Sequence, residues 1–145
     1  MTNEFDLTGR VALVTGSTRG IGAALAGALE TAGARVWRHG HPSEGKEAVL
    51  QADLLEPDAP SQLLDRIDGP APDVLVCNAG GFFDQPFLEM DMETFRKTQR
   101  LNVEQAYFLI QGFARRLAGE SRAGAVVIVS STNGFQSEED STAYD

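Results

Sequence analysis

The stretch that decides the fold is Thr15-Gly16-Ser17-Thr18-Arg19-Gly20-Ile21-Gly22. It follows the apolar run 11–14 and opens a segment, 20–32, in which apolar residues recur at helical spacing. Unpaired backbone N–H groups and the positive end of a helix dipole meet at such a turn, and glycine lets the backbone approach a ligand closely. The sequence therefore predicts a phosphate-binding turn. The glycines alone leave open a turn that only connects the strand to the helix.

Length and composition predict one globular domain over residues 1–145. The formal net charge of −9 argues against nucleic acid and against an anionic membrane as partners, because both bind basic surfaces. A single cysteine, Cys77, excludes an internal disulfide framework and fits a reducing compartment. The chain has neither a signal-like N-terminus nor an apolar run near ~18 residues, so we expect a cytoplasmic protein. No metal site is expected.

Strands and helices alternate along the chain. Strands are predicted over 10–15, at 36–37, and over 49–52, 73–77 and 125–129. Helices are predicted over 20–32, after Pro57 and over 92–118, and a loop over 39–46. Short apolar strands that alternate with helices are typical of a parallel sheet covered on both faces. The predicted fold class is therefore α/β, a Rossmann-type doubly wound parallel sheet, with ligands beyond the carboxyl ends of the strands.

Further residues of chemical interest follow the later strands. Cys77-Asn78-Ala79-Gly80 ends the fourth strand, and Asp53 follows the third. Asn102 interrupts an apolar helical stretch, although asparagine is a poor residue for a helix interior. Ser131 follows the fifth strand, and Tyr144 comes thirteen residues later. Taken singly, Asp53 could be a turn residue, Asn102 a solvent-facing side chain, and the serine and tyrosine solvated loop residues.

Together these residues resemble the pattern of the short-chain dehydrogenase/reductase family, including its ketoacyl-reductase-like members. The resemblance covers essentially the whole chain, as the N-terminal part of that family's domain. It implies that the turn at 15–22 holds the pyrophosphate of a nicotinamide cofactor, that Asp53 contacts the adenine amino group, and that a segment after the fourth strand lines the cofactor cleft. The cofactor-binding residues would then be Gly16, Ser17, Thr18, Arg19, Gly20, Ile21, Gly22, Asp53, Asn78, Ala79 and Gly80. The family usually has asparagine where this chain has Cys77.

The same resemblance implies the reversible reduction of a ketone to a secondary alcohol, with a small carbonyl or alcohol compound as substrate. Ser131 would polarise the carbonyl, Tyr144 would donate the proton, and Asn102 would support a proton relay. Both hydroxyl residues suit this chemistry, because hydride addition leaves negative charge on the carbonyl oxygen. Ketoacyl thioesters are the first substrate hypothesis. If the acidic segment 136–140 faced the site, sugars or polyols would be favoured instead, and the segment could equally be a solvated turn.

The sequence favours NADP(H) over NAD(H) as the cofactor. Family members that prefer NAD often have a carboxylate at the end of the second strand, and Trp37-Arg38-His39-Gly40-His41 contains none. Arg19 lies where members that prefer NADP often carry a basic residue. Arg38 or His41 could add positive charge near a 2′-phosphate, and His41 could also be a solvated surface residue.

The family pattern continues beyond the last residue. Its active site ends in Tyr-x-x-x-Lys, which would place a lysine at position 148, after Asp145. We therefore expect a sheet truncated after the fifth strand, little for residues 132–145 to pack against, and almost no activity from the 145-residue chain alone. A complete chain is expected to form a homo-oligomer. The alternatives are a non-catalytic nucleotide-binding domain and a half-domain completed by a partner chain.

Overall fold

The computed structural model describes residues 5–44, 50–83 and 85–145. Its sheet is parallel, with the strand order β3-β2-β1-β4-β5. The strands are β1 (Val11–Val14), β2 (Arg35–Gly40), β3 (Leu50–Gln51), β4 (Val74–Cys77) and β5 (Ala125–Ile128). The chain builds outward from β1 first on one side and then on the other, so the strand order reverses between β1 and β4. The predicted α/β, Rossmann-type fold is confirmed, and ligands are expected at this point of reversal.

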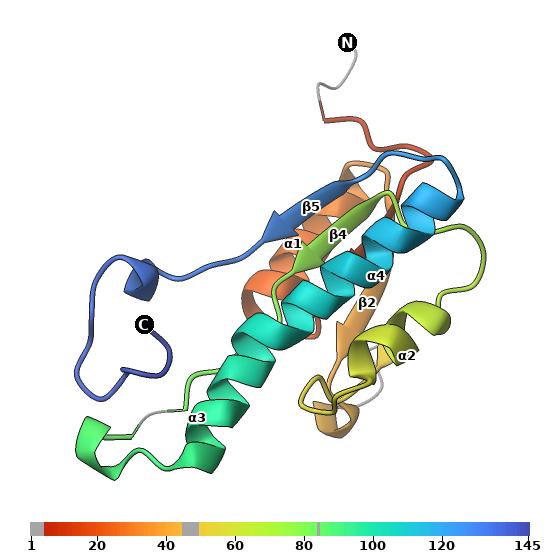
Figure 1. Cartoon of the computed structure of the whole chain (residues 1–145). Coiled ribbons are helices and arrows are strands. Elements are labelled where there is room, and N and C mark those ends of the chain that lie inside the picture. The colour runs from red at the N-terminus through yellow and green to blue at the C-terminus, as the bar shows by residue number, and fades with distance from the viewer. Residues whose placement is uncertain (1–4, 45–49, 84) are drawn as a thin grey trace.

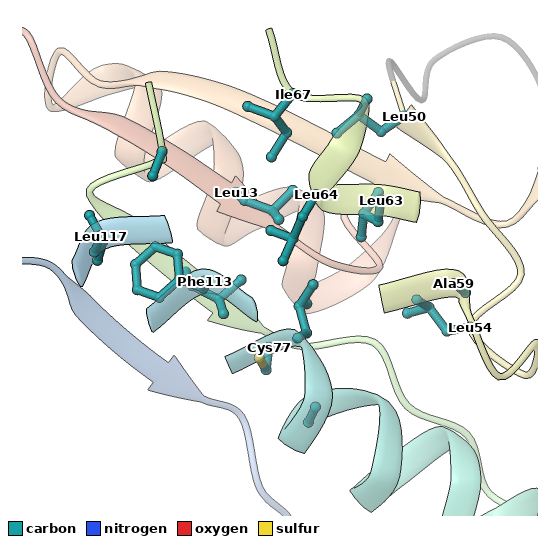
Figure 2. Close-up of a cluster of buried hydrophobic side chains, with 14 residues drawn as sticks. Leu13, Leu50, Leu54, Ala59, Leu63, Leu64, Ile67, Cys77, Phe113 and Leu117 are labelled. Atoms are coloured by element: carbon teal, nitrogen blue, oxygen red, sulfur yellow. The ribbon is translucent and has the colours of Figure 1, made fainter. Parts of the chain in front are cut away.

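Helices cover both faces of the sheet. They are α1 (Gly20–Thr31), α2 (Ala59–Asp65), α3 (Met92–Gln99) and α4 (Gln105–Gly119). Figure 1 shows α2 and α4 in front of the sheet and α1 behind it. The larger core cluster lies under α2 and α4, where Figure 2 shows Leu63, Leu64 and Phe113 around Leu13 of β1. A smaller cluster on the α1 face is built from Val14, Ala26 and Val76. β1 and β4 are thus held from both sides.

The described sheet ends at β5, in agreement with the expected truncation after the fifth strand. The apolar run of β5 is typical of a strand covered on both faces, but Val126, Val127 and Ile128 are 40%, 49% and 60% exposed. β5 pairs with β4 and forms the edge of the described sheet. The apolar composition of β5 shows that its side chains can pack against a covering layer. Within the described residues, the layer that covers β5 is incomplete.

The long helix predicted over 92–118 is interrupted. Residues Arg100–Glu104 form a π-helical turn between α3 and α4. The side chain of Asn102 explains it, because its Nδ2 donates to the Thr98 carbonyl oxygen at 2.9 Å, four residues earlier. A side chain that takes a carbonyl normally used by the helix backbone favours such irregularities. The prediction of a helical stretch over 92–118 is confirmed, and so is the prediction that Asn102 does not fit an ordinary helix.

The loop predicted over 39–46 begins two residues later than expected, because His39 and Gly40 belong to β2. The Ser17 N–H donates to the His39 carbonyl at 2.8 Å, and the Ala52 N–H donates to the Gly40 carbonyl at 3.2 Å. These backbone contacts with the glycine-rich turn and with β3 outweigh the local preference of glycine and proline for loops. Residues 42–44 form a short 3-10 turn, and 45–49 lie outside the described residues.

Two further structural properties bear on function. No helix in the described ranges is long and apolar enough to span a membrane. The same ranges hold no group of three or more His, Cys, Asp or Glu side chains that could hold a metal ion.

Asp73 ties together the starts of the central strands. Its carboxylate accepts hydrogen bonds from the Val11 N–H at 2.8 Å, from Arg122 Nη2 at 2.9 Å and from Arg10 Nη1 at 3.2 Å. Burial of the carboxyl acts to raise its pKa, but these hydrogen bonds together outweigh burial and hold the pKa of Asp73 below its ordinary value. The ionised form therefore stabilises the folded state.

Replacing Asp73 with Asn should lower the free energy of unfolding at pH 7 by about 1–3 kcal/mol, because charged hydrogen bonds are lost. A lowered pKa contributes stability above the unfolded-state value of about 3.9 and loses it as the pH falls through the folded-state value. The difference between the two proteins in urea denaturation should therefore shrink below about pH 4. Asp65→Asn is the control, because its exposed pair with Arg116 should contribute under about 1 kcal/mol. Equal losses in the two variants would contradict a special role for Asp73.

Candidate cofactor and active site

The glycine-rich turn joins β1 to α1 and brings the N-terminus of that helix to the carboxyl edge of the sheet. Gly16 has φ +62°, and a Cβ there would lie 3.0 Å from the Ala79 Cα. Gly22 is more confined, because a Cβ would lie 2.2 Å from the Gly16 carbonyl oxygen. The N-cap residue, Arg19, does not cap α1 with its side chain. The first N–H groups of α1 thus remain available to an anion.

Thr15 and Asn78 lock this turn to the end of β4. The Thr15 hydroxyl oxygen accepts the N–H groups of Asn78 and Ala79, both at 3.0 Å. The Asn78 side-chain amide donates to the carbonyl oxygens of Thr15 at 3.0 Å and Gly16 at 3.1 Å. Thr15 is completely buried. The two loops at the point of strand reversal are therefore one hydrogen-bonded unit.

A cavity of about 730 Å³, called here the first cavity, opens over this unit. Most of the predicted cofactor-binding residues line it, namely Gly16, Thr18, Arg19, Ile21, Gly22, Asp53, Asn78, Ala79 and Gly80. Ser17 and Gly20 do not line it. The Ser17 side chain turns into the protein, where its hydroxyl donates to the Val14 carbonyl oxygen at 2.8 Å. Ser17 therefore supports the turn from beneath.

Acidic and basic side chains both line the first cavity. Asp53 accepts the Leu55 N–H at 2.9 Å, and its carboxylate lies 3.4 Å from His41 Nε2. Arg19 and Lys97 also line this cavity. Arg38 does not line it. Its guanidinium makes a paired contact with the Glu30 carboxylate at 2.8 and 3.0 Å, and its Nη1 donates to the Ser17 carbonyl oxygen at 3.3 Å. The hydrogen bond from Arg38 lowers the pKa of Glu30, so Arg38 is paired with an ionised carboxylate.

A second cavity, of about 630 Å³, brings together Asn102, Ser131 and Tyr144. The Ser131 hydroxyl oxygen accepts the Asn133 N–H at 3.2 Å. Its own proton points to a long contact of 3.4 Å with the Asn133 side-chain oxygen. Tyr144 packs edge-on against Phe82, with ring centroids 5.0 Å apart. Residues from the fifth strand, the long helix and the last turn of the chain thus meet in one hollow.

Asn102 uses its side chain to hold the loop after β4. Its Oδ1 accepts the Gly81 N–H at 3.0 Å, and its Nδ2 donates to the Gly81 carbonyl oxygen at 2.7 Å. The Cys77 thiol, at the end of the same strand, is buried, and burial raises its pKa to about 11. Such a thiol is not a nucleophile at neutral pH. The hydroxyl and amide groups around it are therefore the groups available for chemistry.

The segment that carries Tyr144 is better anchored than the sequence predicts. The Asp145 carboxylate accepts hydrogen bonds from Ser141, from the Asn133 amide at 3.0 Å and from the Glu138 N–H at 3.0 Å. The bond from Ser141 is the main cause of a lowered pKa at Asp145. The Gln99 side chain also donates to the Ala143 carbonyl oxygen at 2.8 Å. The expectation that residues 132–145 have little to pack against holds for 134–140, which are exposed, whereas Asn133, Ser141 and Ala143 are buried.

Comparison with known proteins identifies the family. The family model described as short chain dehydrogenase matches residues 10–145. The chain belongs to the short-chain dehydrogenase family. It is 33% identical over 150 residues to 3-oxoacyl-(acyl-carrier-protein) reductase of Aquifex aeolicus (strain VF5), covering 91% of this chain and 59% of the relative. It is 35% identical over 137 residues to L-xylulose reductase of Bos taurus, covering 88% and 55%.

A solved short-chain dehydrogenase has the same arrangement. The crystal structure of 3-oxoacyl (acyl-carrier-protein) reductase from Agrobacterium tumefaciens C58 with NADP bound superposes with a TM-score of 0.85 at 32% identity. The alignment covers 97% of this chain and 59% of that one. The chain therefore spans somewhat over half of the length of these relatives.

Two residues of the site are missed by sequence reasoning. His39 is predicted to lie in a loop, yet it is 2% exposed and lines the first cavity. Gln105, in the second cavity, donates to the Ala79 carbonyl oxygen at 3.2 Å. Both lie at the carboxyl edge of the sheet only because of contacts with residues more than ten positions away. For His39, its place at the end of a strand was the available signal.

Replacing Gly22 with Ala should destabilise this short-chain dehydrogenase by roughly 1–3 kcal/mol, since the new methyl group must displace the Gly16 carbonyl. Gly27, on the same helix, is a matched control, because nothing lies within 4 Å of its Cβ position. Gly27→Ala should stabilise the protein by about 0.5–1 kcal/mol through helix propensity. Urea denaturation measures both. A neutral Gly22→Ala variant would show that the turn is not tightly packed against α1.

Proposed function

We propose that this chain forms the NADP(H)-binding part, with catalytic serine and tyrosine, of an oxidoreductase that interconverts a ketone and a secondary alcohol. The observation that carries the proposal is that the two cavities share one wall. Ile21 and the segment Asn78–Phe82 line both of them. A dinucleotide that crosses this wall would have its phosphates at α1 and its reactive end beside Ser131 and Tyr144.

The residues of the first cavity fit such a cofactor. Side chains are absent at Gly16 and Gly22 where a Cβ would collide with neighbouring backbone, so the turn can lie directly against a pyrophosphate. Asp53 lines the same cavity, where its carboxylate can accept a hydrogen bond from an adenine amino group. When bound, the nicotinamide cofactor supplies or accepts a hydride.

The second cavity supports the proton chemistry. Within the described residues, the Ser131 hydroxyl proton has one acceptor, the Asn133 side-chain oxygen, at the long distance of 3.4 Å. That proton can therefore turn to a substrate carbonyl oxygen. Tyr144 can then give its phenolic proton to the oxygen as negative charge develops there. Asn102 orients the loop at Gly81 that separates these groups from the first cavity. The acidic segment 136–140 lines neither cavity, so it gives no reason to exclude anionic ketones.

Positive charge supports NADP(H) as the preferred cofactor. Arg19, at the N-terminus of α1, and His41, just beyond β2, both line the first cavity, and β2 ends in Gly40 without a carboxylate. The relative from Agrobacterium tumefaciens has NADP bound. Arg38, the third cationic candidate in the sequence, does not line this cavity and is paired with Glu30. Arg19 and His41 are therefore the groups proposed to meet a 2′-phosphate.

Replacing Arg19 with Ala should raise the Kd for NADPH about tenfold or more, because one charged hydrogen bond contributes about 1.5–3 kcal/mol. The Kd for NADH should change much less. Arg35→Ala, at the first residue of β2 and outside both cavities, is the control and should leave the ratio of the two affinities unchanged. Titration of nicotinamide fluorescence measures both constants. Equal weakening of NADPH and NADH by Arg19→Ala would contradict recognition of the 2′-phosphate.

Replacing Tyr144 with Phe should lower kcat for carbonyl reduction by a factor of order 10²–10⁴, the usual loss for a general acid. The Kd for NADPH should stay within about twofold, because the Phe82 contact survives the loss of one hydroxyl. The assay follows NADPH oxidation with 3-oxoacyl thioesters and ketoses, using the protein expressed from its natural gene. Cofactor binding without turnover of any ketone would contradict the proposed reaction and favour a nucleotide-binding protein that is not an enzyme.

A further inference from the structure

A buried histidine lies beneath the glycine-rich turn and has no part in the chemistry described above. His39 is the last residue but one of β2, and it is 2% exposed. Burying an imidazole is unfavourable unless its polar atoms are hydrogen-bonded. The partners of this ring therefore indicate what the residue does.

Both ring nitrogens of His39 have backbone partners. Nδ1 accepts the Gly16 N–H at 3.1 Å, and Nε2 lies 3.1 Å from the Ala52 carbonyl oxygen. A backbone N–H can only donate and a carbonyl oxygen can only accept, so Nδ1 must carry a lone pair and Nε2 must carry the proton. The contacts thus assign His39 as the neutral tautomer protonated on Nε2.

The backbone of His39 is fixed as firmly as its ring. Its N–H donates to the Ser17 hydroxyl oxygen at 2.9 Å, and its carbonyl accepts the Ser17 N–H at 2.8 Å. The Ser17 hydroxyl in turn donates to the Val14 carbonyl oxygen at 2.8 Å. The ring therefore has a defined position relative to the turn before any ligand binds.

The two ring partners belong to separate segments of the cavity wall. Gly16 opens the turn that leads to α1, and Ala52 directly precedes Asp53. These segments are separated by more than thirty residues, and one imidazole connects them. Because the Gly16 N–H is used by His39, the peptide of Gly16 is held in one orientation, with φ +62°. Thr18 and Arg19, which follow in the same turn, line the cavity.

We propose that His39 is a positioning residue for the dinucleotide: its neutral imidazole fixes the distance and orientation between the phosphate-binding turn at Gly16 and the cavity wall at Ala52–Asp53. This role rests on the proposed cofactor function. His39 acts through Gly16 and Ala52. The bond to Gly16 is the more important of the two, since it sets the peptide on which the phosphate site depends.

Three variants separate the two ring contacts. His39→Asn keeps an acceptor near the position of Nδ1, and His39→Gln keeps a donor near the position of Nε2. His39→Leu removes both and leaves the Gly16 N–H and the Ala52 carbonyl unpaired. We expect the Kd for NADPH to rise about tenfold or more in His39→Leu and His39→Gln, and about threefold or less in His39→Asn. Arg35→Ala is the control and should leave the Kd for NADPH unchanged, because Arg35 begins the same strand and lines neither cavity.

Melting temperatures of the same variants distinguish positioning from a purely structural role. They should fall for both His39→Asn and His39→Gln, because each variant loses one buried hydrogen bond. Rescue of NADPH affinity by Asn but not by Gln, at similar melting temperatures, supports positioning. Affinities that merely follow the melting temperatures, or a variant set in which Gln rescues and Asn does not, overturn it.

The tautomer provides a readout that needs no cofactor. The chain has two histidines, so the His41→Asn variant leaves a single imidazole signal, that of His39. Long-range proton–nitrogen NMR at pH 7.5 should show a proton on Nε2 and a lone pair on Nδ1. A proton on Nδ1, or an average of the two tautomers, would overturn the contact with Gly16.

Failure of the proposed cofactor function and failure of the positioning role of His39 give different results. If the unsubstituted protein does not bind NADPH, the proposed function is wrong and the role of His39 falls with it, whatever the tautomer. If the unsubstituted protein binds NADPH and His39→Leu binds it equally well, the positioning role alone is wrong.

Discussion

The junction of Thr15 with Asn78 is the contact on which the rest of the site depends. Parallel strands β1 and β4 are neighbours in the sheet, but their chain segments are sixty residues apart, and each strand ends in a loop with backbone groups to satisfy. Thr15 accepts two N–H groups of the β4 loop, and Asn78 returns two hydrogen bonds to the β1 turn. Because the hydroxyl is fully buried, these bonds are protected from competition with water. Both cavities are built on this one junction.

Local charge at the site runs against the charge of the whole chain. A protein with a formal net charge of −9 would repel a multiply charged dinucleotide if its charges were spread evenly. The N-terminus of α1, Arg19 and Lys97 place positive potential at the first cavity. Arg38 of β2 is paired with the Glu30 carboxylate of α1, so not every cation near β2 contributes equally. Position relative to a carboxylate partner, more than the number of cations, determines which of them can serve a phosphate.

Sequence alone predicted the parts of the molecule that depend on local geometry. Gly16 and Gly22 are recognisable because a strand, a turn and a helix follow one another within a few residues, and their spacing reflects that path. Asn102 was correctly predicted to conflict with an ordinary helix, since its side chain competes with the backbone one turn away. The family pattern also placed Ser131 and Tyr144 on one surface, and they line one cavity.

The remaining features depend on contacts between distant residues. The sequence around His39 indicates a loop, and only pairing with Ser17 and β3 keeps it in a strand. Ser17 belongs to the phosphate-binding pattern, yet its hydroxyl is used inside the protein. Asp145 gathers three donors around Tyr144, and no periodicity in the segment 132–145 indicates that arrangement. Each of these roles arises from hydrogen bonds that form only after the sheet has assembled.

The two cavities differ in how they are held, and the proposed binding and chemistry are divided between them. The first lies at the ends of β1 and β4 and the start of α1, which pack together through the buried residues Val14, Val76 and Ala26. The second relies on Asp145, on the bond from Gln99 to Ala143 and on β5, whose side chains are 40–60% exposed from Val126 to Ile128. Segments with few buried apolar contacts open at lower free energy than core strands. The cofactor side is therefore preorganised by the core, whereas the position of Tyr144 depends on a small number of polar contacts and on how completely β5 is covered.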